Sequence, residues 1–395
     1  MQPFIFRNPT KVIFGKNAAD RLPQELAAFG ERVLLVYGGG SIKRTGLYDR
    51  LVRHLTQSGK KVFEVPGVMP NPRTEKVYEG IAICRSEKID LVLAVGGGSV
   101  IDCSKMIAAG ALLDGDFWEE LFLNGKSLER SLPLGVILTM PATASEMNGT
   151  AVISHWEGNR KLGYADPLLH PYFSILDPVL TMTMPREQVV FGAVDMMSHV
   201  FEQYFSPPDD NNLTDELAEG LLRNIRLNLD ASLADLRDYQ ARSNLMWDGT
   251  MALNGLLRLG KKGDWQAHKI EHALSAWYDI PHGAGLSIVH PNLLFYIRRE
   301  AEAKLARYAE KVWGICPQDR TQEEMAFAGL KAMRAYFDSI GAPATLGEVG
   351  IPEEAVRDIA YSVSSAEDAG YRALDRRDVY EILKQSLTRR EGLPR

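Results

Sequence analysis

The sequence predicts an α/β half, with a parallel sheet covered by helices on both faces, followed by an all-helical half. In the first half, short apolar runs that end in glycine or proline alternate with amphipathic segments. After Asp177-Pro178, strand signals become few and apolar residues recur at helical spacing. A length of 395 residues fits two domains. We therefore expect one domain over residues 1–185 and a second over residues 186–395.

The expected strands are near-continuous apolar runs, as is typical of strands buried on both faces. They are Arg32–Tyr37, Lys61–Val65, Leu91–Val95, Leu134–Thr139 and Phe173–Leu176. The helices expected from 3.6-residue periodicity are Leu47–Gln57, Thr74–Glu87, Val189–Phe205, Thr214–Leu229, Ala241–Leu259, Trp265–Tyr278, Glu302–Val312 and Thr321–Ile340.

Composition excludes several classes of protein. A net charge of −6 gives no electrostatic footprint for nucleic acid or for an acidic membrane surface. The three cysteines are odd in number and widely spaced, which argues against a disulfide framework or a zinc ribbon. The N-terminus does not read as a signal peptide, and no run of about 18 apolar residues occurs. We expect a cytoplasmic protein without a nucleic-acid or membrane partner.

A glycine-rich turn follows the third expected strand. Leu91–Asp102 reads LVLAVGGGSVID, so a strand runs directly into Gly96-Gly97-Gly98-Ser99 and then into a helix. Glycines let the backbone approach an anion closely, and a helix N-terminus offers free N–H groups and the positive end of the dipole. The pattern predicts a pyrophosphate-binding turn, although it matches neither G-x-G-x-x-G nor the Walker A sequence. A tight strand-to-helix turn without a ligand is the alternative.

Two further turns follow expected strands. The first, Tyr37–Arg44, contains no acidic residue that could hold the adenosine 2′-hydroxyl. Its small residues leave room for a 2′-phosphate, and Lys43 and Arg44 offer positive charge, so we favour NADP(H) over NAD(H). The alternative is that these two side chains form a solvated helix face. The second turn, Thr139–Glu146, carries small hydroxyl residues where an open α/β sheet places its ligands.

The helical half contains two pairs of potential metal ligands at i, i+4 spacing. Asp195 and His199 form one pair, and His268 and His272 form the other, so each pair shares one helix face. His282 follows in a Pro-His-Gly sequence that we expect to be a loop. Four of these residues, Asp195, His199, His268 and His282, would offer one carboxylate and three imidazoles. This set suits Fe2+, Zn2+, Co2+ or Ni2+, and such an ion can act as a Lewis acid.

Other interpretations of these residues exist. Each one, taken alone, is more often a solvated or hydrogen-bonded side chain than a ligand. Residues 268–272 also read H-x-x-E-H, an inverted zinc-peptidase motif in which His268 and His272 bind zinc and Glu271 activates water. The peptidase hypothesis leaves the glycine turns and the Asp195/His199 pair unexplained.

Together these motifs resemble the iron-containing (group III) alcohol dehydrogenase family, over nearly the whole chain. The sequences that carry the resemblance are Gly96-Gly97-Gly98-Ser99-x-x-Asp102, Pro141-x-Thr143-Ala-Ser145-Glu146, Asp195-x-x-x-His199, and His268-x-x-x-His272 with Pro281-His282-Gly283. Residues 9–15 and Asn71-Pro72 also match. The Tyr37–Ser41 turn and Lys161–Tyr164 are similar to those of the NADPH-dependent aldehyde reductases and butanol dehydrogenases within this family.

The resemblance implies a Rossmann-like N-terminal domain, a helical metal-binding domain as in dehydroquinate synthase-like folds, and a cleft between them. It implies that Asp195, His199, His268 and His282 hold the metal. For the cofactor, it matches Gly97, Gly98, Ser99 and Asp102 to the pyrophosphate loop, and Asn71, Thr139, Thr143, Lys161 and Leu180 to the lining. Gly38, Gly39 and Ser41 are the small residues of the turn that we assign to the adenosine side.

The function expected is reversible, metal-dependent hydride transfer between NADP(H) and short-to-medium aliphatic aldehydes or primary alcohols. His272 is the candidate for proton relay, because an imidazole titrates near neutrality; a role in orienting His268 is the alternative. The competing hypotheses are the zinc peptidase and a non-catalytic nucleotide- or metal-binding protein of the same fold. We expect a homodimer.

Overall fold

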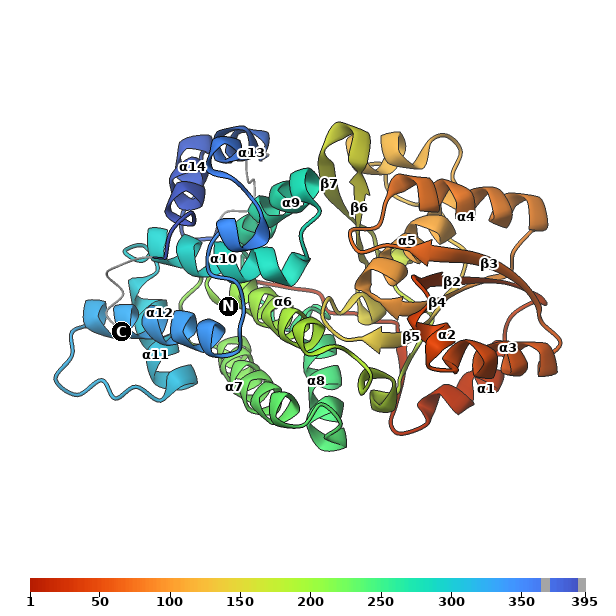
Figure 1. The fold of residues 1–395 in the computed structure, drawn as a ribbon, viewed down its shortest axis with the longest axis horizontal. Helices are drawn as coiled ribbons and strands as arrows, with labels where there is room; N and C mark the ends of the chain where they lie inside the picture. Colours follow the sequence, from red (N-terminus) through yellow and green to blue (C-terminus); the bar gives the residue numbers. More distant parts are fainter. Residues whose placement is uncertain (364–369, 390–395) are drawn as a thin grey trace. The chain divides into compact units, whose positions relative to one another are not determined.

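The computed structural model describes residues 1–363 and 370–389 (Figure 1), which form two compact units. The first, here called the sheet unit, contains Arg7–Met184 and Asp235–Asn254. The second, the helical unit, contains Met1–Phe6, Pro185–Ala234 and the described part of Gly255–Arg395. Pro185 begins the helical unit, where we expected a boundary, but residues 1–6 and 235–254 lie in the other unit from the one expected.

Helix α8 (Tyr239–Ala252) accounts for the larger of these two differences. Its Thr250 hydroxyl donates a 2.6 Å hydrogen bond to Glu146 of the sheet unit. Helical periodicity predicted that this segment is a helix, with an end seven residues later than observed at Ala252. Periodicity carries no information about which unit a helix packs against, so α8 was placed with its sequence neighbours.

A six-stranded parallel sheet forms the centre of the sheet unit, in the order β1-β8-β5-β4-β2-β3. Its strands are β1 (Lys11–Phe14), β2 (Arg32–Gly38), β3 (Lys61–Val68), β4 (Leu91–Gly97), β5 (Leu134–Met140) and β8 (Phe173–Leu176). All five expected strands are confirmed. β1 was not expected, because it is a four-residue edge strand without the continuous burial of the others. A separate antiparallel hairpin joins β6 (Thr150–His155) to β7 (Arg160–Ala165).

Helices cover both faces of this sheet, because alternate residues of each strand point to opposite sides. On β2, Val33 and Leu35 belong to a buried cluster with α1 (Leu22–Leu26) and α3 (Leu47–Gln57). The intervening Leu34 and Val36 belong to a second cluster. Its helices are α4 (Thr74–Glu87) and α5 (Gly98–Ala111). The prediction of a parallel sheet buried on both faces is therefore confirmed.

The described part of the helical unit contains five helices that were expected and three that were not, which are α10, α13 and α14. Its helices are α6 (Arg186–Tyr204), α7 (Leu213–Ala234), α9 (Gln266–Tyr278), α10 (His282–Tyr296), α11 (Glu302–Trp313), α12 (Gln322–Ser339), α13 (Val356–Ser362) and α14 (Arg376–Gln385). The expectation that His282 lies in a loop is wrong, since it is the first residue of α10. This helix is buried on nearly all sides, so it lacks the polar face that reveals a helix in a sequence. Within the described ranges, no helix combines the length and apolar character needed to cross a bilayer.

Candidate metal centre and nucleotide-binding turns

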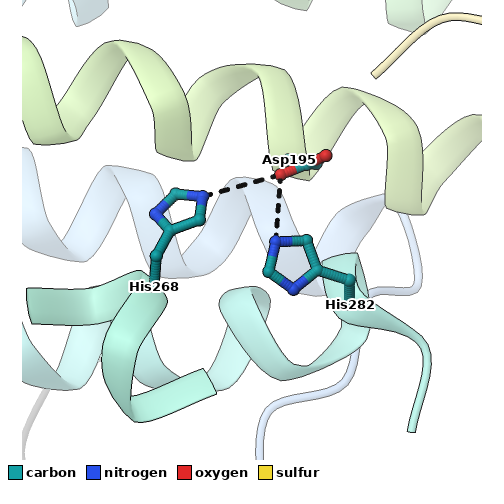
Figure 2. A group of neighbouring side chains, drawn as sticks. All are labelled: Asp195, His268 and His282. Carbon is teal, nitrogen blue, oxygen red and sulfur yellow. Dashed lines mark ion pairs between the residues drawn. The ribbon is translucent and has the colours of Figure 1, made fainter. Parts of the chain in front are cut away.

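Three histidines surround one carboxylate oxygen in the helical unit. Oδ1 of Asp195 lies 3.6 Å from Nδ1 of His199, 3.7 Å from Nε2 of His268 and 3.5 Å from Nε2 of His282. Figure 2 shows Asp195 on α6 facing the rings of His268 and His282, which come from α9 and α10. The structure thus places all three expected histidines around Asp195, and the ligand atoms of Asp195, His268 and His282 all lie within 4.8 Å of one another.

The local sequence explains how these elements meet. Asp195 and His199 lie one turn apart on α6, so their side chains share one face. Gly283, the second residue of α10, packs so tightly on α6 that a Cβ atom there would lie 2.2 Å from the Phe191 carbonyl oxygen. Only glycine permits this contact, and the contact carries the adjacent His282 toward Asp195. The Pro-His-Gly sequence is therefore a helix start fitted against α6.

Buried polar atoms at this point lack the partners that a closed protein core would provide. Oδ1 of Asp195 and Nε2 of His268 are buried and make no hydrogen bond to any described residue. An unsatisfied buried oxygen and nitrogen are costly unless something binds them. Their convergence with two further imidazoles, at distances that a central cation would bridge, fits a divalent ion with mixed nitrogen and oxygen ligands.

Charge within the cluster also favours a cation. Burial opposes ionisation of Asp195, but the neighbouring His199, His282 and His268 hold the pKa of its carboxyl group well below the usual range. Burial likewise opposes the charged form of the His268 imidazole, yet Asp195 and Glu202 raise its pKa to about 9. The site therefore attracts positive charge, and a metal ion would take the place of the imidazole proton.

Two buried glutamates stand behind the histidines. Oε1 of Glu202 accepts hydrogen bonds from both the backbone N–H and Nδ1 of His268, each at 3.0 Å. Glu271 accepts hydrogen bonds from Nδ1 of His282 and from the Ser275 hydroxyl. A carboxylate on Nδ1 fixes the tautomer that leaves Nε2 facing a metal. Sequence reasoning missed Glu202, although it lies seven residues after Asp195, on the same face of α6.

His272 lies beside this cluster. Its ring centroid is 5.6 Å from that of His282 and 6.4 Å from that of His268. Its ligating atoms group with those of Glu271 and His282, whereas those of His268 group with Asp195 and His282. The pair that a peptidase motif would place on one ion is therefore divided between two groups. Glu271, its presumed base, is already bonded to His282 and Ser275.

In the sheet unit, the two glycine turns emerge side by side. β2 and β4 are neighbours with Tyr37 opposite Val95, so both turns leave the same edge of the sheet. The chain runs outward from β2 to β3 and then returns to β4 on the other side, which makes the space beyond β2 and β4 a topological switch point. Open parallel sheets bind nucleotides at such points.

Residues 38–41 of the first glycine turn, which read Gly-Gly-Gly-Ser, contain no bulky side chain. A Cβ atom on Gly38 would lie 3.2 Å from the Val68 carbonyl oxygen, whereas a Cβ atom on Gly39 would meet nothing within 4 Å. Ser41 begins the short helix α2 (Ser41–Arg44). The ammonium group of Lys43 lies over the Tyr37 ring, 5.1 Å from its centroid. These residues leave open space bordered by a positive charge.

The second glycine turn is in close contact with the turn that follows β5. Gly97 precedes α5 in an extended conformation, and Ser99 lies in the first turn of that helix. A Cβ atom on Gly98 would lie 2.5 Å from the Thr143 side chain. Thr139, at the end of β5, lies in the same edge because Gly97 pairs with Met140. Glycine is therefore required at position 98, because the Thr143 side chain leaves no room for a Cβ atom there.

The remaining residues matched to the cofactor surround this edge. Buried Asn71, in the left-handed conformation (φ 51°), follows β3, and Leu180 lies in the short helix η6 (Pro178–Thr181) after β8. Lys161 is buried on β7 opposite Ser154, whose N–H donates to the Pro72 carbonyl oxygen at 2.8 Å. The hairpin thus brings Lys161 to the segment that contains Asn71.

Asp102 differs from the others. It is only 9% exposed, and both of its oxygens accept hydrogen bonds within the sheet unit. Oδ1 accepts from the Ser145 hydroxyl at 2.5 Å, and Oδ2 accepts from the backbone N–H of Val152 at 2.9 Å. Its place in the glycine-rich sequence indicated a cofactor ligand, but its side chain points into the protein.

Comparison with known proteins agrees with this architecture. The profile described as iron-containing alcohol dehydrogenase matches residues 9–178, and the profile of the C-terminal part of the Fe-containing alcohol dehydrogenase family matches residues 189–387. A probable NADH-dependent butanol dehydrogenase of Bacillus subtilis (strain 168) is 46% identical over 388 residues, covering 98% of this chain and 100% of the relative. The NADPH-dependent aldehyde reductase YqhD of Escherichia coli (strain K12) is 38% identical, covering 89% of this chain and 90% of the relative.

A solved structure shows the same fold. The crystal structure of NADH-dependent butanol dehydrogenase A from Thermotoga maritima matches with a TM-score of 0.94 and 41% identity, covering 98% of this chain and 99% of that one. Matches of this extent at both the sequence and the structural level define family membership. The chain belongs to the iron-containing alcohol dehydrogenase family, whose members use a divalent metal and a nicotinamide cofactor, and it is an oxidoreductase acting on alcohols or aldehydes.

Proposed function

We propose that this chain reduces short-to-medium aliphatic aldehydes to primary alcohols, reversibly, with NADP(H) and one divalent metal, Fe2+ or Zn2+. The observation that carries the proposal is the convergence of three imidazole nitrogens within 3.5–3.7 Å of one buried oxygen of Asp195. Around that oxygen, we assign the ligand roles to Asp195, His199, His268 and His282.

The metal and cofactor, when bound, supply polarisation of the substrate oxygen and a hydride. The chain's own residues would hold the metal and orient its ligands. Glu202 keeps Nε2 of His268 directed at Asp195, and Glu271 does the same for His282. His272, beside His282 but in a different ligand group, holds a proton that it can release to the product oxygen.

For the cofactor, we propose NADP(H) at the edge where the glycine turns emerge. The proposed lining comprises Gly38, Gly39, Ser41, Asn71, Gly97, Gly98, Ser99, Thr139, Thr143, Lys161 and Leu180. Preference for NADP(H) rests on the open Gly38-Gly39 turn and on Lys43 beside it. The butanol dehydrogenases of Bacillus subtilis and Thermotoga maritima are named NADH-dependent, whereas the Escherichia coli reductase is named NADPH-dependent.

One experiment tests the activity and the cofactor together. Oxidation of NADPH and of NADH is followed with butyraldehyde and longer aliphatic aldehydes, for the metal-loaded wild type and for Asp195→Ala. We expect a higher kcat/KM with NADPH, and a loss of more than about a hundredfold in Asp195→Ala, because a ligand contributes more than the residues behind it. Full activity in Asp195→Ala would overturn the metal assignment, and a higher kcat/KM with NADH would overturn the NADP(H) preference.

A homodimer and a cytoplasmic location are also proposed. Strand β1 lies at the sheet edge, and its Phe14 stacks edge-on with Trp247 at a centroid distance of 6.0 Å, with both rings substantially exposed. An exposed strand edge beside apolar rings supports association with a second copy. Light scattering during size-exclusion chromatography tests this, because a mass of 43.9 kDa would show a monomer.

A further inference from the structure

Asp102 and Lys105 lie one turn apart on α5, the helix whose N-terminus follows the second glycine turn. Both are buried, and the face that they share is directed at the segment between β5 and β6. Asp102 accepts hydrogen bonds from Ser145 and from the Val152 N–H, as described above. No oxygen of this carboxylate remains without a protein donor.

Lys105 makes a matching set of bonds. Its ammonium group donates to the Asn148 carbonyl oxygen at 2.9 Å, to Asn148 Oδ1 at 3.0 Å and to the Thr150 carbonyl oxygen at 2.7 Å. Three donors thus meet three acceptors, the full capacity of a lysine. Asn148 links Lys105 to Thr143, because its Nδ2 donates to the Thr143 carbonyl oxygen at 3.2 Å.

The segment held in this way is strained and closely packed. Ala144 adopts the left-handed conformation (φ 52°), which a residue with a Cβ atom adopts only when its surroundings impose it. Its neighbour Thr143 packs against Gly98 with no room for a side chain there. The Ser145 N–H also donates to Thr143 Oγ1, at 3.2 Å. A turn in this conformation needs anchors on both sides of Ala144.

Asp102 and Lys105 are also coupled electrostatically. Burial raises the pKa of Asp102, while the nearby Lys105 ammonium group and the Ser145 hydroxyl oppose that rise. Buried charges are kept when they are paired and hydrogen-bonded, and removing one partner leaves the other at a cost. Such a network favours one defined geometry over the alternatives.

We infer that Asp102 and Lys105 are positioning residues for the cofactor site: through Ser145 and Asn148 they hold the Thr143 turn against Gly98. Helix α5 would therefore have two roles: its N-terminus would bind the pyrophosphate of the proposed cofactor, and Asp102 and Lys105 hold the Thr143 turn. Asp102 acts through protein groups and does not contact the cofactor. The inference rests on the proposed nucleotide site.

The test is a double-mutant cycle on cofactor affinity. Dissociation constants for NADPH and for NADH are measured by calorimetry for wild type, Asp102→Ala, Ser145→Ala and the double variant. Each single change is expected to weaken binding of the preferred cofactor about five- to tenfold, and the double variant about as much as one single change, because the two side chains act as one link. Losses that add would show independent contacts and overturn the inference, as would unchanged affinity in both single variants.

Asp102→Asn separates positioning from direct contact. An asparagine can accept from the Val152 N–H and donate to the Ser145 hydroxyl, so it should keep affinity within about threefold of wild type. If Asp102→Asn loses as much affinity as Asp102→Ala, the negative charge itself contributes to binding and the inference fails. Asn148→Ala cuts the second anchor and should weaken cofactor binding while the metal content, measured by mass spectrometry, stays unchanged.

Cys103→Ala is the matched control. Cys103 is buried on the same helix, next to Asp102, but belongs to the apolar cluster. Its truncation should lower the melting temperature without changing cofactor affinity, so a general weakening of α5 is distinguishable from loss of the anchors. If the wild type itself binds neither NADPH nor NADH, the proposed function fails, which differs from any outcome for the variants.

Discussion

Glu271 accepts a hydrogen bond from Nδ1 of His282, eleven residues further along the chain and at the start of a different helix. The acidic residue of the H-x-x-E-H sequence therefore serves a histidine that lies outside that sequence. The carboxylate orients the Nε2 atom of His282 toward Asp195, 3.5 Å away. The motif that resembles a peptidase helix is therefore part of the proposed metal centre, together with residues of α6 and α10.

Glu271→Gln should weaken the metal site. The amide cannot keep the same hydrogen bonds to His282 and Ser275, so we expect metal affinity to fall about ten- to a hundredfold. Competition with a chromogenic chelator measures the affinity, and reductase activity should follow metal occupancy. Glu323→Gln, an exposed acid-to-amide change on α12, is the control. Peptide hydrolysis by the wild type that disappears in Glu271→Gln would instead support the peptidase hypothesis.

His272→Asn should separate proton transfer from metal binding. Because the ligand atoms of His272 do not group with Asp195, the variant should retain its metal, in contrast to Asp195→Ala. We expect kcat to fall about ten- to a hundredfold and one limb of the pH profile of kcat to flatten. Metal content and kcat are measured on the same preparations. An unchanged pH profile combined with loss of metal would assign His272 an orienting role.

Gly39→Asp should reverse the cofactor preference. A Cβ atom at this position meets nothing within 4 Å and the backbone is not left-handed, so the fold tolerates the substitution. The new carboxylate would repel a 2′-phosphate and could accept a hydrogen bond from a 2′-hydroxyl. We expect kcat/KM for NADPH to fall by more than about tenfold while that for NADH is maintained or rises. Gly39→Ala adds the Cβ without the charge, and equal losses in both variants would contradict the explanation.

Asp248→Asn should stabilise the protein in a pH-dependent manner. Burial raises the pKa of Asp248, on α8, to about 7, above the value of about 3.9 expected in the unfolded chain. Between these values the folded protein binds more protons, so the contribution of Asp248 to stability is lost as pH rises and is absent above pH 7. The difference in free energy of unfolding between the variant and wild type should therefore grow by about 2 kcal/mol, in favour of the variant, from pH 5 to pH 8.

Denaturation at both pH values measures this difference. Asp114→Asn, at an exposed position of the same unit, is the control and should show no such change between the two pH values. A constant difference between Asp248→Asn and wild type across this range would show that the buried carboxyl group does not titrate there.

The parts of the fold that could be predicted are those whose burial leaves a pattern. The central strands are apolar throughout, and α3 and α12 each have one apolar and one polar face, so both signals are visible in the sequence. Helix α10 was not predicted because it is buried on nearly all sides. Strand β1 was not predicted because it lies at the edge of the sheet, with only one neighbouring strand and little continuous burial.

The contacts of the candidate site were likewise predictable only where they leave a pattern in the sequence. Spacing of i and i+4 along one helix joined Asp195 to His199, because both lie on α6. The contact between His268 and Glu202 spans 66 residues and two helices, and no spacing rule expresses it. For Asp102, sequence position identified the right turn, but the direction of a side chain depends on its partners. Ser145 and Val152, which donate hydrogen bonds to the Asp102 carboxylate, lie 43 and 50 residues away.

The chain passes from one unit to the other after residues 6, 184, 234 and 254, and the last two passages enclose α8. The two units are consequently not interchangeable modules. A hybrid enzyme that joins this sheet unit to a relative's helical unit at residue 185 would replace α8 as well. The buried Glu146 would then depend on the donor sequence for the hydroxyl that Thr250 supplies here. Recombination within the family should therefore succeed more often when residues 235–254 are inherited together with residues 7–184.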